Sequence, residues 1–403
     1  MESSFTLDNL NRVTSLNNAK LIYDYTLDAA GNRRQVIEHL PNEAGRTVNW
    51  SYDNIYRLTD EVISLDPHSK NGNAHYDLDP VGNRTQETAT LPGLLPGSFT
   101  YDFDDRLNTE TYDANGNTLT SGGRTFTYDF ANRLKSMTAG SVSVTIQYDA
   151  DSNRVAKTVN GVTTRYLVDD LNPTGYAQVV EEVTAGAVTR QYTYGLQRIN
   201  ETQQIANAWI PTFYGYDGGG TVRLLTDSTG TVTDTYDYDA WGNEVNTTGS
   251  TPNNYLYRGE QYDSDLGLYY LRARYLDTLT GRFLTRDPAQ GTIQIPQTLH
   301  KYLYVGANPM RFVDPTGHDA IEEAEESEIS ISFGHGARHA AAAGLNPAQV
   351  EAAIETVTRE LLASGNVAGN FWAYVQVEGV DIWFRAYFVT AVWLNIGTYT
   401  IGH

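Results

Sequence analysis

The sequence predicts a mainly β protein that ends in a small α+β domain. A short motif recurs within residues 1–317, the composition favours strands and turns, and residues 319–403 follow a different pattern. The chain has 403 residues, with 35 Gly, 28 Tyr and only 3 Met. Tyrosine is enriched in strands and glycine in turns. At about 150 residues per domain, this length fits two or three domains.

The recurring motif is a Tyr-Asp pair whose copies follow one another at short and often similar intervals. Self-similarity of this kind is typical of a repeat architecture in which each unit packs against its neighbours. The copies are Tyr23-Asp24, Tyr52-Asp53, Tyr76-Asp77, Tyr101-Asp102, Tyr112-Asp113, Tyr128-Asp129 and Tyr148-Asp149.

A Gly-Asn turn often follows the pair, as in Gly31-Asn32 and Gly82-Asn83. Such residues supply the positive φ that two-residue hairpins need, so each unit is expected to be strand, tight turn, strand. Residues 124–128 and 142–146 alternate polar and apolar side chains, as half-buried strands do. We expect no amphipathic helix before about residue 340.

Composition excludes several classes of function. The net charge of −21 argues against a surface that coats nucleic acid. The absence of cysteine excludes disulfides, thiolate metal sites and cysteine nucleophiles. The N-terminus has no cleavable signal peptide pattern, and no stretch approaches the roughly 20 apolar residues of a membrane-spanning helix. Export would therefore need a dedicated secretion system, or the chain is a piece of a longer one.

The most specific motifs lie between residues 236 and 317. The chain reads Tyr-Asp-Ala-Trp-Gly-Asn at 238–243, Leu-Gly-Leu-Tyr-Tyr-Leu-Arg-Ala-Arg-Tyr at 266–275 and Gly-Arg-Phe-Leu-Thr-Arg-Asp-Pro at 281–288. It closes with Asp-Pro-Thr-Gly at 314–317. This series resembles the core segment that ends the shells of the YD-repeat, or Rhs, family.

The resemblance implies a β-strand ribbon that spirals into a hollow shell, or cocoon, with the core segment as its plug. Residues 1–235 would form the YD-repeat shell, 236–318 the Rhs core, and 319–403 a variable C-terminal domain, commonly a toxin, that the shell encloses. A shell that ends near Gly317 is shorter than is usual in the family, which suggests a small or open cage or the C-terminal part of a longer protein.

The resemblance also implies that the core is an aspartic-type autoprotease. Its two aspartates and one arginine correspond to Asp287, Asp314 and Arg274. Two carboxylates that meet cannot both ionise, so such a pair can serve as acid and base. Cleavage would fall at the His318–Asp319 bond, where the family usually has Leu in place of His318. The alternative is that Asp287-Pro288 and Asp314-Pro315 are ordinary turns.

The tail changes character after residue 318. An acidic run within 319–330 is expected to be a solvated linker. Asn346 and Pro347 begin a predicted helix that Gly365 ends. The tail is therefore expected to contain a short helix, this longer helix and a three- or four-stranded antiparallel sheet. Its strands are predicted at 371–377, 382–389 and 392–401.

Polar residues in the tail suggest nucleic-acid chemistry without a metal or cofactor. His335, Arg338 and His339 would share one face of a helix. Arg385 lies in a predicted strand among aromatic residues and requires an anionic partner. The remaining candidates are Thr398, Thr400 and His403. One histidine as base, an arginine for phosphate charge and hydroxyl donors fit a metal-independent ribonuclease. The layout weakly resembles the barnase–EndoU–colicin–RelE group of toxin ribonucleases.

The leading interpretation is a polymorphic toxin used in bacterial competition. It would be secreted without a cleavable signal peptide, and its tail would cut RNA in the cytoplasm of a target cell. A cognate immunity protein and a delivery apparatus would be its partners.

Three alternatives stay open at this stage. In the first, the tail is a toxin with an activity other than a nuclease. In the second, it binds Zn²⁺ through His335, His339 and His403. In the third, the chain is a YD-repeat surface or adhesion protein with the tail as a structural cap.

Overall fold

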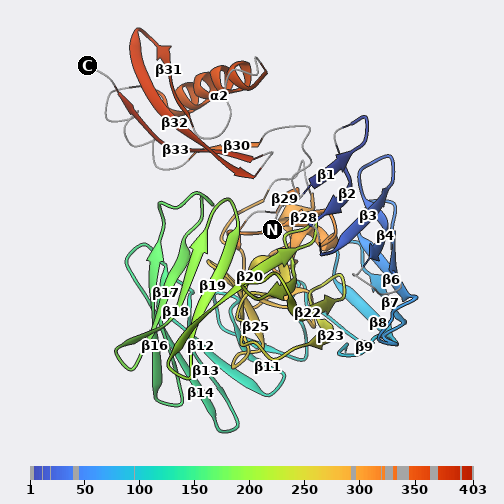
Figure 1. Ribbon diagram of the computed structural model, residues 1–403. Helices are drawn as coiled ribbons and strands as arrows, with labels where there is room; N and C mark the ends of the chain where they lie inside the picture. Colours follow the sequence, from blue (N-terminus) through green and yellow to red (C-terminus); the bar gives the residue numbers. More distant parts are fainter. Residues whose placement is uncertain are drawn as a thin grey trace.

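The computed structural model is dominated by antiparallel sheets, as the repeat pattern predicts. Two large sheets lie on opposite sides of the molecule, and the core segment runs between them (Figure 1). The structure describes residues 4–10, 12–18, 20–39, 45–94, 96–291, 296–318, 320–322, 330–333, 345–363, 371–390 and 393–401.

The first sheet has nine strands that pair in chain order, so each strand lies beside the next one in the sequence. Its strands are β1 (Ser4–Leu7), β2 (Val13–Asn17), β3 (Ile22–Leu27), β4 (Arg33–His39), β5 (Arg46–Tyr52), β6 (Leu58–Ser64), β7 (Gly72–Leu78), β8 (Arg84–Ala89) and β9 (Gly97–Ser98).

The second sheet continues the same meander over fourteen strands, again in chain order. Its strands are β10 (Thr111–Tyr112), β11 (Thr118–Ser121), β12 (Arg124–Tyr128), β13 (Leu134–Ala139), β14 (Val142–Tyr148), β15 (Arg154–Val159), β16 (Val162–Asp169), β17 (Gln178–Thr184), β18 (Ala187–Tyr194), β19 (Arg198–Ile205), β20 (Ala208–Tyr216), β21 (Val222–Thr226), β22 (Val232–Tyr238) and β23 (Glu244–Thr248).

The rest of the core segment is compact and contains short elements. A four-stranded sheet is followed by a two-stranded one. These comprise η1 (Tyr257–Gly259), β24 (Gln261–Asp263), β25 (Leu268–Leu271), β26 (Arg274–Asp277), β27 (Arg282–Phe283), η2 (Pro296–Leu299), η3 (Val305–Ala307), β28 (Phe312–Val313) and β29 (Ile321–Glu322). Because β29 pairs with β28, two residues of the predicted acidic linker form a strand against the core segment.

The aspartate of a typical Tyr-Asp pair closes a five-residue turn. In the turn that begins at Asp129, the carboxylate accepts hydrogen bonds from the backbone N–H groups of Ala131 and Arg133, at 2.9 and 3.0 Å. The Arg133 Nε atom donates to the other carboxylate oxygen at 2.8 Å. The same arrangement recurs at Asp53 and Asp102. One side chain thus satisfies backbone donors that a tight bend leaves unpaired.

This turn corrects the expectation of two-residue hairpins at the Gly-Asn slot. The slot belongs to a longer turn, in which the residue before the Asn or Arg takes the positive φ, as Gly82 does at 108° and Asn132 at 63°. The two-residue turns lie at other hairpin ends, for example Gly122-Gly123 and Asn160-Gly161.

The tyrosine of the pair links one repeat to an earlier one. In four of the seven copies, at Tyr52, Tyr101, Tyr128 and Tyr148, the hydroxyl donates to a backbone carbonyl 10 to 19 residues back, as from Tyr52 to Arg33 at 2.6 Å and from Tyr128 to Thr118 at 2.8 Å. In these copies, both residues of the pair therefore have a structural role.

The main hydrophobic core lies between the large sheets and includes the core segment. Tyr23 and Ile63 of the first sheet share one buried cluster with Leu224 of the second sheet and with Tyr257 and Phe283 of the core segment. The core segment therefore fills the space that the sheets surround.

The described tail residues form a small α+β unit. A helix, α2 (Pro347–Ala363), contacts a sheet made of β30 (Ser330–Phe333), β31 (Phe371–Val377), β32 (Val380–Thr390) and β33 (Trp393–Ile401). Asn346 accepts a hydrogen bond from the backbone N–H of Ala348 at 3.0 Å, as the predicted cap requires. Figure 1 shows this unit beyond one end of the large sheets.

One tail prediction is wrong: the sheet is mixed rather than antiparallel. β30 pairs with β33 in parallel, and the strand order is β30-β33-β32-β31. Parallel neighbours require a long crossover connection, which the segment containing α2 and two strands supplies. The predicted short helix with His335, Arg338 and His339 lies outside the described residues, as does His403. In the described part of the chain, no helix is long and apolar enough to span a membrane.

Candidate active site

Arg274, Asp287 and Asp314, which lie on separate segments, meet inside the core segment. The Arg274 Nη2 atom lies 2.9 Å from Asp287 Oδ2 and 3.3 Å from Asp314 Oδ2. Both carboxylates therefore contact one guanidinium nitrogen. The side chains of Arg274 and Asp314 are 5% and 3% exposed, whereas that of Asp287 is 14% exposed, so Asp287 lies on the more open side of the cluster.

The surrounding fold fixes each of these side chains. Arg274 begins β26, and its guanidinium stacks on the Phe283 ring at 3.7 Å. Asp287 follows β27; its Oδ1 atom accepts from the Ala289 N–H at 2.8 Å. Asp314 follows β28 directly. The three residues thus approach from three elements of one compact unit.

The environment of Asp314 favours its protonated form. Burial raises the pKa of this carboxyl to about 6, against the opposing effect of Arg274. A charged carboxylate loses hydration when it is buried, whereas a nearby cation stabilises the charge. An aspartate with a pKa in this range can hold a proton under mildly acidic conditions and give it up near neutral pH.

Residues 314–318 form a tight turn around the Asp314 carboxylate. Its Oδ1 atom accepts from the His318 backbone N–H at 2.9 Å and from the Thr316 hydroxyl at 3.2 Å. Gly317 has a φ of 74°, and a Cβ there would lie 2.2 Å from the Leu271 carbonyl oxygen. Only glycine fits this position without a backbone shift. His318 is exposed, whereas Asp319 lies outside the described residues.

Two residues near this cluster were not singled out from the sequence. Arg272 donates from Nη1 to the Pro315 carbonyl and to both carboxylate oxygens of Glu260, the latter at 2.9 and 3.0 Å. Both residues lie within the core segment, but nothing in their spacing distinguishes them from other charged residues. Their proximity depends on the way the hairpin β25–β26 folds against residues 315–317.

The structure describes the backbone of only part of the predicted nuclease constellation. In the tail sheet, Arg385 pairs with Thr398, and Trp383 pairs with Thr400. The two threonines therefore lie at successive alternate positions beside one strand. His335, Arg338 and His339 lie outside the described residues, so their predicted roles stay predictions.

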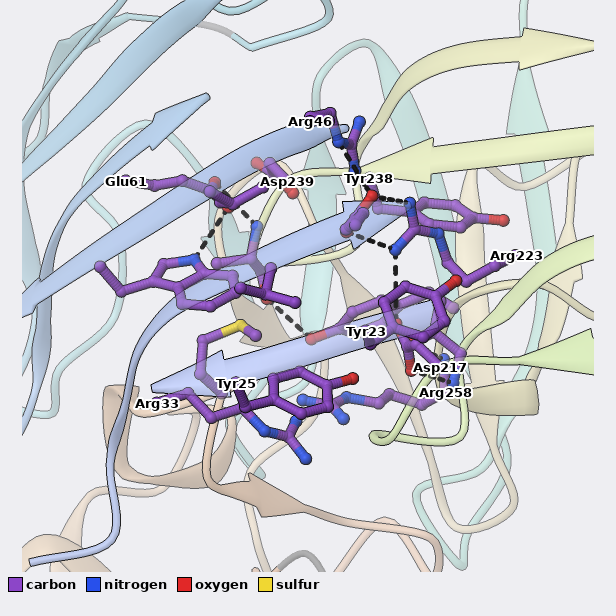
Figure 2. Close-up of a pocket in the computed structure, with 18 residues that line it drawn as sticks. Tyr23, Tyr25, Arg33, Arg46, Glu61, Asp217, Arg223, Tyr238, Asp239 and Arg258 are labelled. Carbon is purple, nitrogen blue, oxygen red and sulfur yellow. Dashed lines mark hydrogen bonds and ion pairs between the residues drawn. The ribbon is translucent and has the colours of Figure 1, made fainter. Parts of the chain in front are cut away.

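A cavity between the two large sheets is polar but small. Tyr23, Glu61, Arg223, Tyr238 and Asp239 are among its lining residues (Figure 2). Its volume is about 50 Å³, which holds a few water molecules. Sites for organic ligands usually measure about 300 to 1,000 Å³. We therefore do not regard this cavity as a substrate site.

Charged residues beside the cavity join the two sheets. Arg223 of β21 makes two hydrogen bonds of 2.9 Å to Glu38 of β4 and one of 2.8 Å to Asp237 of β22. Arg46 of β5 lies 3.0 Å from the same glutamate. Burial opposes ionisation, but Arg223 and Arg46 outweigh it and lower the pKa of Glu38 to about 2. These contacts connect the first sheet to the second.

One group of described residues has the donor atoms of a metal site. Ligand atoms of Asp66, His68 and Asp237 lie within 4.8 Å of one another. Arg46 Nη1, however, lies 3.1 Å from Asp237 and 3.6 Å from Asp66. A cation already occupies the position between these carboxylates, so the group fits an ion-pair network better than a metal centre.

Residues 1–310 match the Teneurin YD-shell family. The chain belongs to that family. The resemblance drawn from the Tyr-Asp pairs and the core motifs is thereby confirmed, together with the mainly β shell fold.

Curated relatives of this YD-shell chain include proteins named as nucleases. The tRNA nuclease WapA of Bacillus subtilis is 34% identical over 306 residues, which cover 74% of this chain and 11% of that protein. The probable deoxyribonuclease RhsA of Dickeya dadantii is 22% identical over 342 residues, covering 78% of this chain and 20% of that protein. The chain thus spans about a tenth to a fifth of the length of these relatives.

Solved structures similar to this chain share its shell fold. The Photorhabdus luminescens Tc holotoxin pore matches with a TM-score of 0.64 and 17% identity, over 80% of this chain and 18% of that one. A TcdB2-TccC3 crystal structure matches with a TM-score of 0.63 and 19% identity, over 78% and 18% of the two chains. At these identities, the likeness establishes the fold.

Proposed function

We propose that this chain is the shell and effector portion of a polymorphic toxin that cuts its own chain after His318. The observation that carries the proposal is the contact of Asp287 and Asp314 with the single cation Arg274, beside the turn that leads to the bond. Membership of the YD-shell family supports this role. A pair of turns far from each other would not be expected to share a buried arginine.

The proposed reaction is hydrolysis of the His318–Asp319 peptide bond. The Asp287 carboxylate takes a proton from water, and the resulting hydroxide oxygen attacks the His318 carbonyl carbon. Asp314 gives its proton to the leaving nitrogen of Asp319, and the C–N bond breaks. One water is consumed and one new carboxyl and one new amino group form. Arg274 keeps the two carboxyl groups together and, through Nε, holds the Gly317 carbonyl.

Intact mass spectrometry of the purified full chain tests this reaction. We expect two fragments, residues 1–318 and residues 319–403, whose masses together exceed that of the uncut chain by one water. A single uncut mass after prolonged incubation between pH 5 and 7 would contradict the proposal. Fragments with other ends would move the cleavage to a different bond.

We also propose that the released tail is a metal-independent ribonuclease. Support comes from the relatives named as tRNA nucleases and from the candidate residues His335, Arg338, His339, Arg385, Thr398 and Thr400. A histidine would take the proton of the RNA 2′-hydroxyl, and an arginine would stabilise the charge on the phosphate. In this proposal, a delivery apparatus carries the toxin into a competitor's cytoplasm, and a cognate immunity protein protects the producer.

RNA integrity tests the nuclease proposal. The full chain, after self-cleavage, would be incubated with total cellular RNA in EDTA, beside a His335→Ala/His339→Ala double variant. Degradation by the unmodified protein alone is the expected result. Intact RNA with both proteins would reject the ribonuclease and leave a different toxin activity or a structural cap.

A further inference from the structure

Three successive carbonyl groups before the proposed cleavage bond are each held by one hairpin tip. Arg272 donates from Nη1 to the Pro315 carbonyl, and Arg274 donates from Nε to that of Gly317. Between them, the Ala273 backbone N–H donates to the Thr316 carbonyl at 3.2 Å. Residues 272–274 thus contact 315–317 in register, one donor for each carbonyl.

Arg272 is immobilised from three directions. Glu260 binds its Nη1 atom through both carboxylate oxygens, the Ala177 carbonyl accepts from its Nε atom at 3.2 Å, and the Tyr176 ring lies 5.0 Å from the guanidinium carbon. A guanidinium fixed in this way is already oriented for its contact with Pro315, so little conformational entropy is lost when that contact forms.

The backbone at Arg272 is unusual for the side chain it carries. β25 and β26 are joined by two residues, and Arg272, the first of them, has a φ of 55°. Glycine is strongly favoured at such positions because it has no Cβ. Strain of this kind persists where surrounding contacts compensate for it, and it is often associated with functional sites. Here the compensation includes the contact with Pro315.

On the side of residues 315–317, these three contacts use backbone carbonyls and no side chains. Gly317 is the one position where a side chain is excluded, because a Cβ would collide with Leu271 and lie 2.9 Å from the Arg274 nitrogen. His318 is exposed, and Asp314 binds its backbone N–H. In a site of this kind, the number of residues between the held carbonyls and a peptide bond determines whether that bond is cut.

We propose that Arg272 is a positioning residue that sets which peptide bond is cut. By holding the Pro315 carbonyl, it fixes the register of 315–317 against the hairpin, and in this proposal that register decides which peptide bond the Asp287–Asp314 pair cuts. The side chain of residue 318 has no part in the choice. This inference rests on the proposed self-cleavage and names its specificity determinant.

A time course of cell-free synthesis of the full chain tests this role, because it captures the protein before cleavage. The variants are Arg272→Ala and Arg272→Lys, with Asp314→Asn as the uncut reference. Arg124→Ala is the matched control, since Arg124 also anchors the core segment, through Asp277 and the Leu266 carbonyl, but does not contact 315–317. Intact mass identifies the bond that is cut.

For Arg272→Ala, we expect cleavage to slow about tenfold or more and new fragments to end one or two residues from His318. Arg272→Lys should restore the single cut in part, because it keeps a cationic donor. For Arg124→Ala, we expect slower cleavage only if part of the protein is unfolded. The cut should still fall at the His318–Asp319 bond alone. His318→Leu should still be cut at the bond after residue 318, whatever its rate.

Two results would overturn the inference. One is an Arg272→Ala chain that cuts at the unmodified rate and at the His318–Asp319 bond alone. The other is a His318→Leu chain that cuts elsewhere. Cleavage of Asp314→Asn would instead reject the proposed mechanism. If Arg272→Ala does not fold, Glu260→Gln is tested instead, because it keeps Arg272 but weakens the contact that holds its guanidinium. Fragments with mixed ends would then support the inference. A single cut at the unmodified rate would reject it.

Discussion

Two five-residue turns in this chain share the pattern Asp-Pro-x-Gly-x, one in the repeat region at 79–83 and one in the core segment at 314–318. In the repeat turn, Asp79 Oδ1 accepts from the backbone N–H groups of Val81, Gly82 and Asn83 at 2.9 to 3.0 Å. In the core turn, Asp314 Oδ1 accepts from the His318 N–H. In both turns, the aspartate at the first position thus binds the backbone N–H of the fifth residue.

The second carboxylate oxygen distinguishes the two turns. Asp79 Oδ2 accepts from the Asn83 amide at 3.0 Å, a neutral donor within its own turn. Asp314 Oδ2 contacts Arg274, a cation from another element that also binds Asp287. A third turn, at Asp239, is buried but keeps the neutral partner Asn243 at 2.9 Å. In the proposed mechanism, the Asp314 turn differs from the repeat turns by combining burial with an arginine that it shares with a second carboxylate.

The largest expected difference between the turns is in cleavage itself. Asp314→Asn removes the proposed acid and should reduce the rate about 1,000-fold, within the usual range for a lost acid–base group. Asp79→Asn keeps a turn-forming side chain and should cut like the unmodified protein. Gel analysis of the full chains over one day measures both. Equal cutting by the two variants would mean that Asp314 is only a turn residue.

A methyl group added to each turn gives the next largest difference. Gly317→Ala would place a Cβ against the backbone oxygen of Leu271, whereas Gly82→Ala would meet the Leu303 side chain at 2.8 Å, which can rotate away. Because misplacement by about 1 Å can cost a factor of about 100 in rate, Gly317→Ala should cut roughly 100-fold more slowly. Gly82→Ala should lower only the unfolding temperature. Normal cutting by Gly317→Ala would show that the hairpin register is not required.

The pH dependence of cleavage provides a smaller but more specific difference. A proton donor must be protonated to act, and burial raises the pKa of Asp314 to about 6. The rate should therefore fall about tenfold for each pH unit above 6. Cleavage of refolded full chain, followed at several pH values from 5.5 to 8, gives this profile. A rate that rises over this range would assign the proton donation to another group.

Sequence reasoning located the family, the shell and the three residues that meet at Arg274, because these depend on motifs that are local in the chain. It missed the five-residue form of the repeat turns, because a Gly-Asn pair is compatible both with a two-residue hairpin turn and with the five-residue turn. It also missed the contacts of Arg272 with Glu260 and Pro315, which form only when segments that are distant in the sequence fold together. In the tail, the capped helix at Asn346 was predicted correctly, whereas the parallel pairing of β30 depends on long-range contacts.

The smallest expected effect is on the pH dependence of stability, and it concerns the buried turn at Asp239, whose side-chain partner is Asn243. Glu61 accepts from the Ala240 N–H at 2.9 Å, and burial together with Asp239 raises its pKa. The pKa of Asp239 is raised by burial as well. The folded chain therefore keeps a proton that the unfolded chain releases, so this pair stabilises the fold at mildly acidic pH and less as the pH rises toward 8.

Asp239→Asn should reduce this pH dependence without affecting cleavage. The variant removes the like charge beside Glu61 and keeps an oxygen that can accept hydrogen bonds in the turn. In an Asp314→Asn background, which prevents fragmentation, the unfolding temperature should fall a few degrees less between pH 5.5 and 8.5 than without the Asp239 change. An unchanged dependence would mean that other groups control it. Lost cleavage in the single Asp239→Asn variant would mean that a buried repeat turn, even with a neutral partner, contributes to the chemistry.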